Sequence, residues 1–151
     1  MNDISCILIF LGILMMCCST EIGKHGLKTI LVPTDFLEPS DVALQIAIDL
    51  AGQQNARIHL LHVLPFRHNA DEKEMMEKQI AKFPEAGSVE IVPEIRKGKI
   101  YEEILKAQTE KNIDLIIIAR HNNTESLFTF FRSITEKVKK YAQCSVLVVG
   151  A

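Results

Sequence analysis

From residue 26 onwards, short apolar runs alternate with longer segments whose apolar residues recur at helical spacing. Segments that begin near residues 39, 71, 99 and 133 predict four helices. The apolar runs between them are rich in Val, Ile and Leu, which is typical of strands buried on both faces of a sheet; they occupy residues 28–33, 57–63, 88–92, 115–119 and 145–149. This alternation predicts one doubly wound α/β domain with a five-stranded parallel sheet and right-handed crossovers.

Prolines set several of the expected boundaries. Pro33 is expected to end the first strand, because proline cannot donate to a central ladder, and Pro93 is expected to stop the third. Pro39 suits the first turn of the first helix. The residues expected to face the core are Val42, Ala43, Ile46, Ala47 and Leu50 in the first helix, Met75, Met76, Ile80 and Phe83 in the second, and Ile100, Ile104, Leu105 and Ala107 in the third.

The N-terminal segment departs from this pattern. Residues 4–20 carry no charge, and their apolar stretch is shorter than the roughly 20 residues that a spanning helix needs. Lys24 and Lys28 follow it, so the positive-inside bias would leave the domain, residues 26–151, in the cytoplasm. Three interpretations of residues 1–25 stay open: an extension from an upstream start codon, a membrane tether, or an extra apolar element packed on the domain or on a partner.

Composition and charge exclude several classes of function. The chain has 151 residues, is 24% charged and carries a net charge of −2, with lysines and acids mixed, so a nucleic-acid partner is not expected. No HExxH, CxxC or GxSxG motif occurs, and we expect neither a metal site nor a catalytic centre. His59 and His62 are expected to point to opposite faces or ends of their strand. The four cysteines form no readable disulfide framework. The adjacent Cys17 and Cys18 have no nearby His and no CxxC spacing, so we expect small buried apolar residues there in preference to palmitoylation or metal sites.

The order and spacing of several segments resemble the universal stress protein family over residues 27–150. These segments are Ile30-Leu31-Val32-Pro33-Thr34-Asp35, Leu61-His62-Val63, Gly98 before a helix, Asp114-Leu-Ile-Ile-Ile118, and Ser133-Ile-Thr-Glu-Lys-Val138 leading to Cys144-Ser-Val-Leu-Val148. The resemblance implies a flavodoxin-like fold, of the adenine nucleotide alpha hydrolase type, with strand order 3-2-1-4-5. It also implies a homodimer joined through the last strand, 145–149, protein partners, and a regulatory role in stress. We expect no enzyme, and an enzyme hypothesis would rest only on the slow nucleotide hydrolysis that the resemblance occasionally implies.

Family members that bind ATP, with Mg²⁺, carry a glycine-rich loop after the fourth strand. Its pattern is Gly, two residues, Gly, nine residues, and Gly followed by Ser or Thr, and the glycine positions fall here at Ala119, Asn122 and Arg132, with Ser133 in the hydroxyl position. Glycine serves there because backbone N–H groups must approach phosphate closely, in conformations that a Cβ penalises. Arg132 either occludes the site or pairs with a phosphate. We therefore expect ATP binding to be weakened or absent.

The resemblance also assigns the residues of the nucleotide site, if that site functions. They are Pro33, Thr34, Asp35, Val63, Ala119, Arg120, His121, Asn122, Arg132, Ser133 and Ile134. Asp35 either contacts the nucleotide near the adenosine or caps its own turn. Ser133 either contacts phosphate or forms a capping box with Glu136 at a helix start. Three functions stay open: a dimeric regulatory module without bound nucleotide, an ATP-binding stress sensor, and a membrane-tethered version of either.

Overall fold

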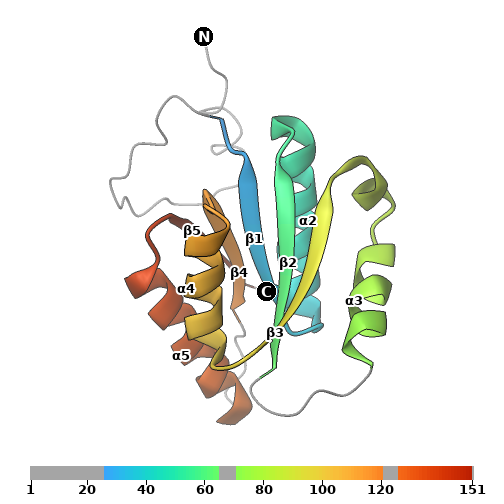
Figure 1. The fold of residues 1–151 in the computed structure, drawn as a ribbon. Helices are drawn as coiled ribbons and strands as arrows, with labels where there is room; N and C mark the ends of the chain where they lie inside the picture. The colour runs from blue at the N-terminus through green and yellow to red at the C-terminus, as the bar shows by residue number, and fades with distance from the viewer. Residues whose placement is uncertain (1–25, 65–70, 121–125, 151) are drawn as a thin grey trace.

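The computed structural model describes residues 26–64, 71–120 and 126–150, and only the backbone for 126–132. Its five strands form one parallel sheet in the order β3-β2-β1-β4-β5, which confirms the predicted doubly wound fold and the strand order 3-2-1-4-5 (Figure 1). The elements are β1 (Thr29–Thr34), α2 (Glu38–Gln54), β2 (Arg57–Leu64), α3 (Glu72–Ala81), the 3₁₀ helix η1 (Pro84–Ser88), β3 (Ile91–Lys97), α4 (Ile100–Glu110), β4 (Leu115–Arg120), α5 (Ser126–Tyr141) and β5 (Ser145–Gly150).

The sheet is covered on both faces, which explains why its inner strands have so few polar residues. Figure 1 shows α4 and α5 in front of the sheet and α2 behind it. Alternate residues of β1 serve the two layers: Ile30 packs in a cluster with Leu44 of α2 and Met76 of α3, whereas Leu31 packs in a second cluster with Ile104 of α4. A parallel strand buried on both sides has no position for an exposed polar side chain.

The sequence predicts that Pro33 ends β1, but the strand continues to Thr34. The carbonyl of Lys28 accepts a hydrogen bond from the amide of Arg57 at 2.8 Å. The backbone N–H and C=O groups of the even-numbered residues of β1 therefore point toward β2, and those of the odd-numbered residues point toward β4. Pro33 therefore faces β4, and the pairing between β1 and β4 extends only as far as Leu31. The N–H group that proline lacks is not required at this point of the ladder.

Pro93 likewise lies inside β3 instead of ending it, so the predicted strand 88–92 is displaced to Ile91–Lys97. The amide of Ile58 donates to the carbonyl of Glu90 at 2.9 Å, which places the even-numbered residues toward β2. Pro93 then faces the open edge of the sheet, where no neighbouring strand needs a donor. β3 lies at the edge of the sheet, as the predicted strand order requires, and an edge strand tolerates proline.

The buried faces of the helices differ in part from the prediction. Val42 and Met75 are 41% and 43% exposed, although both were expected to face the core, and Leu105 is only half-buried. The other helix residues that were expected to face inward are buried or pack partly buried against the two clusters. In α2 the fully buried face also includes Ser40, because small side chains allow this helix to approach the sheet closely.

The interpretations of residues 1–25 concern a segment outside the described residues. In the part of the chain that the structure describes, no helix is long and apolar enough to cross a membrane. Cys144 is a free cysteine whose pKa is raised to about 11, chiefly by burial. Its thiol is therefore protonated near neutral pH, and its side chain packs partly buried against the cluster on the α4 side of the sheet.

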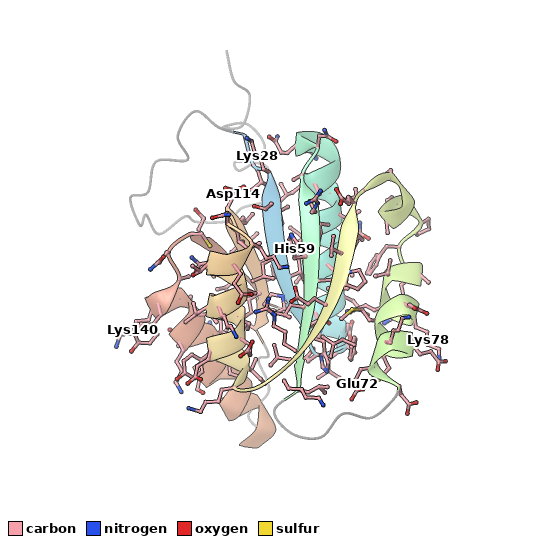
Figure 2. All side chains as sticks on the ribbon, in the orientation of Figure 1. Lys28, His59, Glu72, Lys78, Asp114 and Lys140 are labelled. Atoms are coloured by element: carbon pink, nitrogen blue, oxygen red, sulfur yellow. The ribbon has the colours of Figure 1, made fainter. Side chains whose placement is uncertain are left out.

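Asp114 connects the amino ends of β1 and β4. Its Oδ2 atom accepts the backbone amides of Lys28 and Thr29, each at 2.9 Å, and the hydroxyl of Thr29 at 3.0 Å. The amide of Asp114 in turn donates to the carbonyl of Thr29 at 3.0 Å. Figure 2 shows Lys28 and Asp114 together at this end of the sheet. One carboxylate thus sets where the central strand begins relative to β4.

His59 lies in a charged layer between β2, β3 and α4. Its side chain is 6% exposed, and its Nδ1 atom has no hydrogen-bond partner among the described residues. Burial, and then the nearby charge of Lys111, lower the pKa of His59 below its ordinary value. Arg96 lies in the same layer and pairs with Glu94 and Glu110, each at 2.7 Å. His59 is therefore a neutral residue of the interior, facing away from His62, as predicted.

We expect Asp114→Ala to lower the free energy of unfolding by about 1–2 kcal/mol, because the amides of Lys28 and Thr29 lose a charged acceptor at an exposed site. Urea unfolding measures this loss. Asp49→Ala is the matched control, since the exposed Asp49 accepts one hydrogen bond from Gln45 on the same helix, and a surface change of this kind stays within about 0.5 kcal/mol. Equal effects of the two substitutions would contradict the role assigned to Asp114.

We expect the free energy of unfolding to fall as the pH drops from about 6.5 toward the lowered folded-state pKa of His59, because the unfolded chain then binds a proton that the folded chain does not. Above about pH 6.5 the buried, neutral His59 no longer makes the free energy of unfolding depend on pH. His59→Gln removes this part of the slope, which is at most about 1.4 kcal/mol per pH unit. Urea unfolding at several pH values measures it, with His62→Gln as the control that keeps it. Equal slopes for native protein and His59→Gln would sink the assignment.

Candidate functional site at the carboxyl ends of β1 and β4

The predicted site lies where the strand order reverses. β1 has β2 on one side and β4 on the other, so the connections that leave the carboxyl ends of β1 and β4 run to opposite faces of the sheet. This is the position at which open α/β sheets bind ligands. The predicted residues that come together at the end of β1 are Pro33, Thr34 and Asp35.

Asp35 caps its own turn. Its Oδ1 atom accepts the amide of Leu37 at 3.1 Å and the hydroxyl of Ser40 at 2.6 Å. The amide of Asp35 lies 3.4 Å from the same hydroxyl oxygen. Of the two roles predicted for Asp35, the structure thus contains the capping role, and the carboxylate is committed by at least one oxygen to the start of α2.

Thr34 and Phe36 form a tightly held turn with β2. The amide of Phe36 donates to the Thr34 hydroxyl at 3.1 Å, and Nδ1 of His62 lies 2.7 Å from the Thr34 carbonyl oxygen. Because a carbonyl only accepts, Nδ1 must carry the proton. The ring centroids of Phe36 and His62 are 4.3 Å apart, and Phe36 has a φ of 64°, which is unusual for a bulky residue. The sequence gives no direct signal for this backbone conformation.

The remaining predicted residues on the strands are mostly core. Val63 is 6% exposed and packs in the α4-side cluster, and Ala119 is 7% exposed and packs in the α2-side cluster. Arg120 is half-buried at the end of β4. His121 and Asn122 lie outside the described residues.

α5 begins seven residues earlier than predicted, and this changes the role of Ser133. The helix runs from Ser126 to Tyr141, so Arg132 and Ser133 lie inside it. The predicted capping box of Ser133 and Glu136 is therefore wrong, because neither residue is at a helix start. Ile134 is 5% exposed and belongs to the α4-side core. The side chain of Arg132 lies outside what the structure describes.

A shallow pocket lies at the opposite end of the sheet. It is formed by the end of α2 and the starts of β1 and β2, and its lining includes Lys28, Asn55, Arg57 and Glu90. Arg57 and Glu90 are paired there at 2.8 Å. This pocket is separate from the predicted site. Among the described residues, no group of three His, Cys, Asp or Glu side chains could hold a metal ion.

Comparison with known proteins agrees with the resemblance. The sequence model of the Universal stress protein family matches residues 26–150. The universal stress protein MJ0531 of Methanocaldococcus jannaschii is 28% identical over 143 residues, which is 84% of each chain. Among solved structures, the hypothetical protein MJ0577 superposes with a TM-score of 0.69 at 27% identity, over 84% of this chain and 98% of that one.

Two further solved structures are similar in fold and contain a nucleotide. A universal stress protein in complex with cAMP superposes with a TM-score of 0.71 at 18% identity, over 83% of this chain and 98% of that one. A universal stress protein of Archaeoglobus fulgidus in complex with dAMP superposes with a TM-score of 0.65 at 18% identity, over 81% and 97% of the two chains. With a family match over nearly the whole domain, this chain belongs to the universal stress protein family.

Proposed function

We propose that this protein is a dimeric regulatory module of the cytoplasm whose nucleotide site binds the phosphate groups of ATP weakly or not at all. The observation that carries the proposal is the early start of α5. Ser133, which the family pattern assigns to phosphate, is the eighth residue of a helix that begins at Ser126. The proposal includes no catalytic step.

The reason is the availability of backbone donors. A phosphate-binding loop presents amide N–H groups that have no intrahelical partner, as the first four amides of a helix do. Amides deeper in an α-helix donate to the carbonyl four residues earlier. The amides of Arg132, Ser133 and Ile134 lie beyond the first turn of α5, so they are committed within the helix. The absence of glycine at Ala119 and Arg132 acts in the same direction.

The geometry at β1 supports the same conclusion. Asp35, which the resemblance places near the adenosine, uses Oδ1 to hold Leu37 and Ser40. A ligand that recruited this oxygen would have to replace two hydrogen bonds of the protein. The cAMP and dAMP complexes of the two similar structures are the reason to keep a nucleotide sensor as the opposing outcome of the test.

The proposed dimer uses the edge formed by β5. The other edge strand, β3, carries Pro93 and the charged residues Glu94 and Arg96, which discourage pairing with another chain. β5 has the sequence Ser-Val-Leu-Val-Val-Gly, with neither proline nor charge, and its first five residues are half-buried. An apolar edge with unpaired backbone groups suits a second copy of this chain, and this difference between the two edges favours β5.

Calorimetric titration of ATP and Mg²⁺ into the full chain tests the site. We expect no binding at micromolar ATP; a dissociation constant in that range would correspond to a binding free energy of about −8 kcal/mol. Arg132→Ala serves as the matched variant, because it removes the side chain and preserves the helix, whereas Arg132→Gly also loosens the helix by about 1 kcal/mol.

The variants separate two causes. If Arg132 occludes the site by its side chain, affinity appears in both variants; if the helical backbone is the cause, Arg132→Ala stays silent. Micromolar binding by the native chain would overturn the proposal and identify a nucleotide sensor instead.

Sedimentation of the native protein tests the dimer. We expect a dimer, and we expect Leu147→Lys to weaken it at least about tenfold, or 1.4 kcal/mol, by placing like charges across the paired edges. Val92→Lys, the same change in polarity on edge strand β3, should leave the dimer intact. Circular dichroism controls for folding. A monomeric native protein, or a dimer that only Val92→Lys disrupts, would rule out the β5 interface.

A further inference from the structure

A chain of hydrogen-bonded polar side chains, buried at Thr34 and Gln79, connects the end of β1 to α3. The hydroxyl of Thr34 donates to Oε1 of Gln79 at 2.9 Å, and Nε2 of Gln79 donates to Oδ1 of Asp41 at 2.8 Å. The other oxygen of Asp41 accepts from Nζ of Lys82 at 2.6 Å. Thr34 is 7% exposed and Gln79 is 2% exposed, so neither can exchange these partners readily for water.

The chemistry of the partners fixes the direction of every bond in this chain. A carboxylate only accepts, so the amide nitrogen of Gln79 must face Asp41 and its oxygen must face Thr34. The hydroxyl of Thr34 then has to donate to Gln79, and its oxygen keeps a lone pair for the amide of Phe36, which it accepts at 3.1 Å. If the Gln79 amide were flipped, its Oε1 atom would face Oδ1 of Asp41, and neither oxygen could donate a hydrogen bond.

The last link of the chain holds a strained residue. Phe36 has a φ of 64°, a strained conformation for a residue with a bulky side chain that persists only where the surroundings enforce it. Its amide is held by Thr34 and its ring by His62. Both ends of the chain are thus defined: a strained turn at β1, and the outer helix α3.

We propose that Gln79 is a positioning residue that couples the turn 34–37 to α3. A ligand that docks on the turn changes the order of α3, and loosening of α3 releases the turn. The inference rests on the proposed function only in assigning this turn to the family's ligand site. The hydrogen bonds that support the coupling, from Thr34 to Gln79 and from Gln79 to Asp41, are made in the protein without ligand.

Amide hydrogen exchange on the full chain without ligand tests the coupling. Gln79→Leu should speed exchange of the Phe36 amide and of the α3 amides by about tenfold beyond any global change, as expected for loss of one net hydrogen bond. The matched control is Gln108→Leu, which removes a buried glutamine of α4 whose Oε1 accepts the amide of Gln143 at 3.0 Å. It should leave the turn and α3 unchanged. Equal effects of both substitutions on the turn would overturn the proposal.

Gln79→Glu adds a readout that a merely structural residue would not move. A carboxyl here faces Asp41 of α2, with Lys82 beside it and Thr34 on its other side. The buried Glu72 lies two turns earlier on α3, and Asp35, Glu38 and His62 are the titratable groups at the turn. When protonated, it can donate to Asp41 and accept from Thr34 as glutamine does. Burial and the like charge raise its pKa above about 4.3.

Acidification should therefore return the Phe36 amide resonance of Gln79→Glu toward its native position and should have no such effect on Gln79→Leu. The native protein, titrated in parallel, accounts for His62 and Asp35. A resonance in Gln79→Glu that follows only the native titration would overturn the proposal.

Thr34→Val keeps the test decisive if the glutamine variants do not fold. It removes the hydroxyl at nearly constant shape, and it should speed exchange in α3, across the connection. Change confined to residues 34–37 would reject the coupling. None of these measurements uses a nucleotide, so a failure here is distinct from a failure of the proposed function, which the ATP titration decides.

Discussion

The structure depends on the placement of one strand. β1 is bonded to β2 along its whole length and to β4 only near its start, and Asp114 fixes that start by accepting two amides and one hydroxyl. Except for the connection from β2 to β3, every crossover leaves from or returns to β1 or β4. Because β1 is clamped at its amino end and released from β4 at Pro33, its carboxyl end is free to bend into the turn that forms the candidate site.

The candidate site has two parts, the turn after β1 and the start of α5, and they differ in structure. At β1 the turn is retained, with Asp35 and Thr34 each committed to hydrogen bonds inside the protein. At the start of α5 the family's phosphate position has become helix interior. A fold tolerates such a change because lengthening a helix at a sheet's edge leaves the buried layers intact. Under the proposed function phosphate binding does not survive this change, because phosphate requires amides that helix formation consumes.

Much of the fold was predictable because burial on both faces leaves a strong pattern. The apolar runs located four of the five strands closely and overlapped the third only at residues 91 and 92. The placement of His59 and His62 on opposite sides followed from strand alternation. The prolines were misjudged for a physical reason: Pro33 and Pro93 end a strand only if their N–H is needed by a neighbour. That need depends on which strands are adjacent and where pairing stops, and it cannot be read locally.

The site was less predictable than the fold. Val42 and Met75 were placed in the core because helical spacing defines a stripe without fixing its edges. A buried Gln79 between Met76 and Ile80 was a signal that we did not use, since a polar residue in an apolar stripe implies a buried partner. Its partner Thr34 is 45 residues away, and only packing brings the two together.

By itself, the sequence determined the fold class, the family and the loss of the three loop glycines, because these depend on residue type and order. The tertiary structure decided where α5 begins, how Asp35 is used and which turn is strained. These features are settled by competition between local preferences and distant contacts. Ser133 is the clearest case: a local capping signal was present, and a longer helix packed through Ile134 and Val138 prevailed.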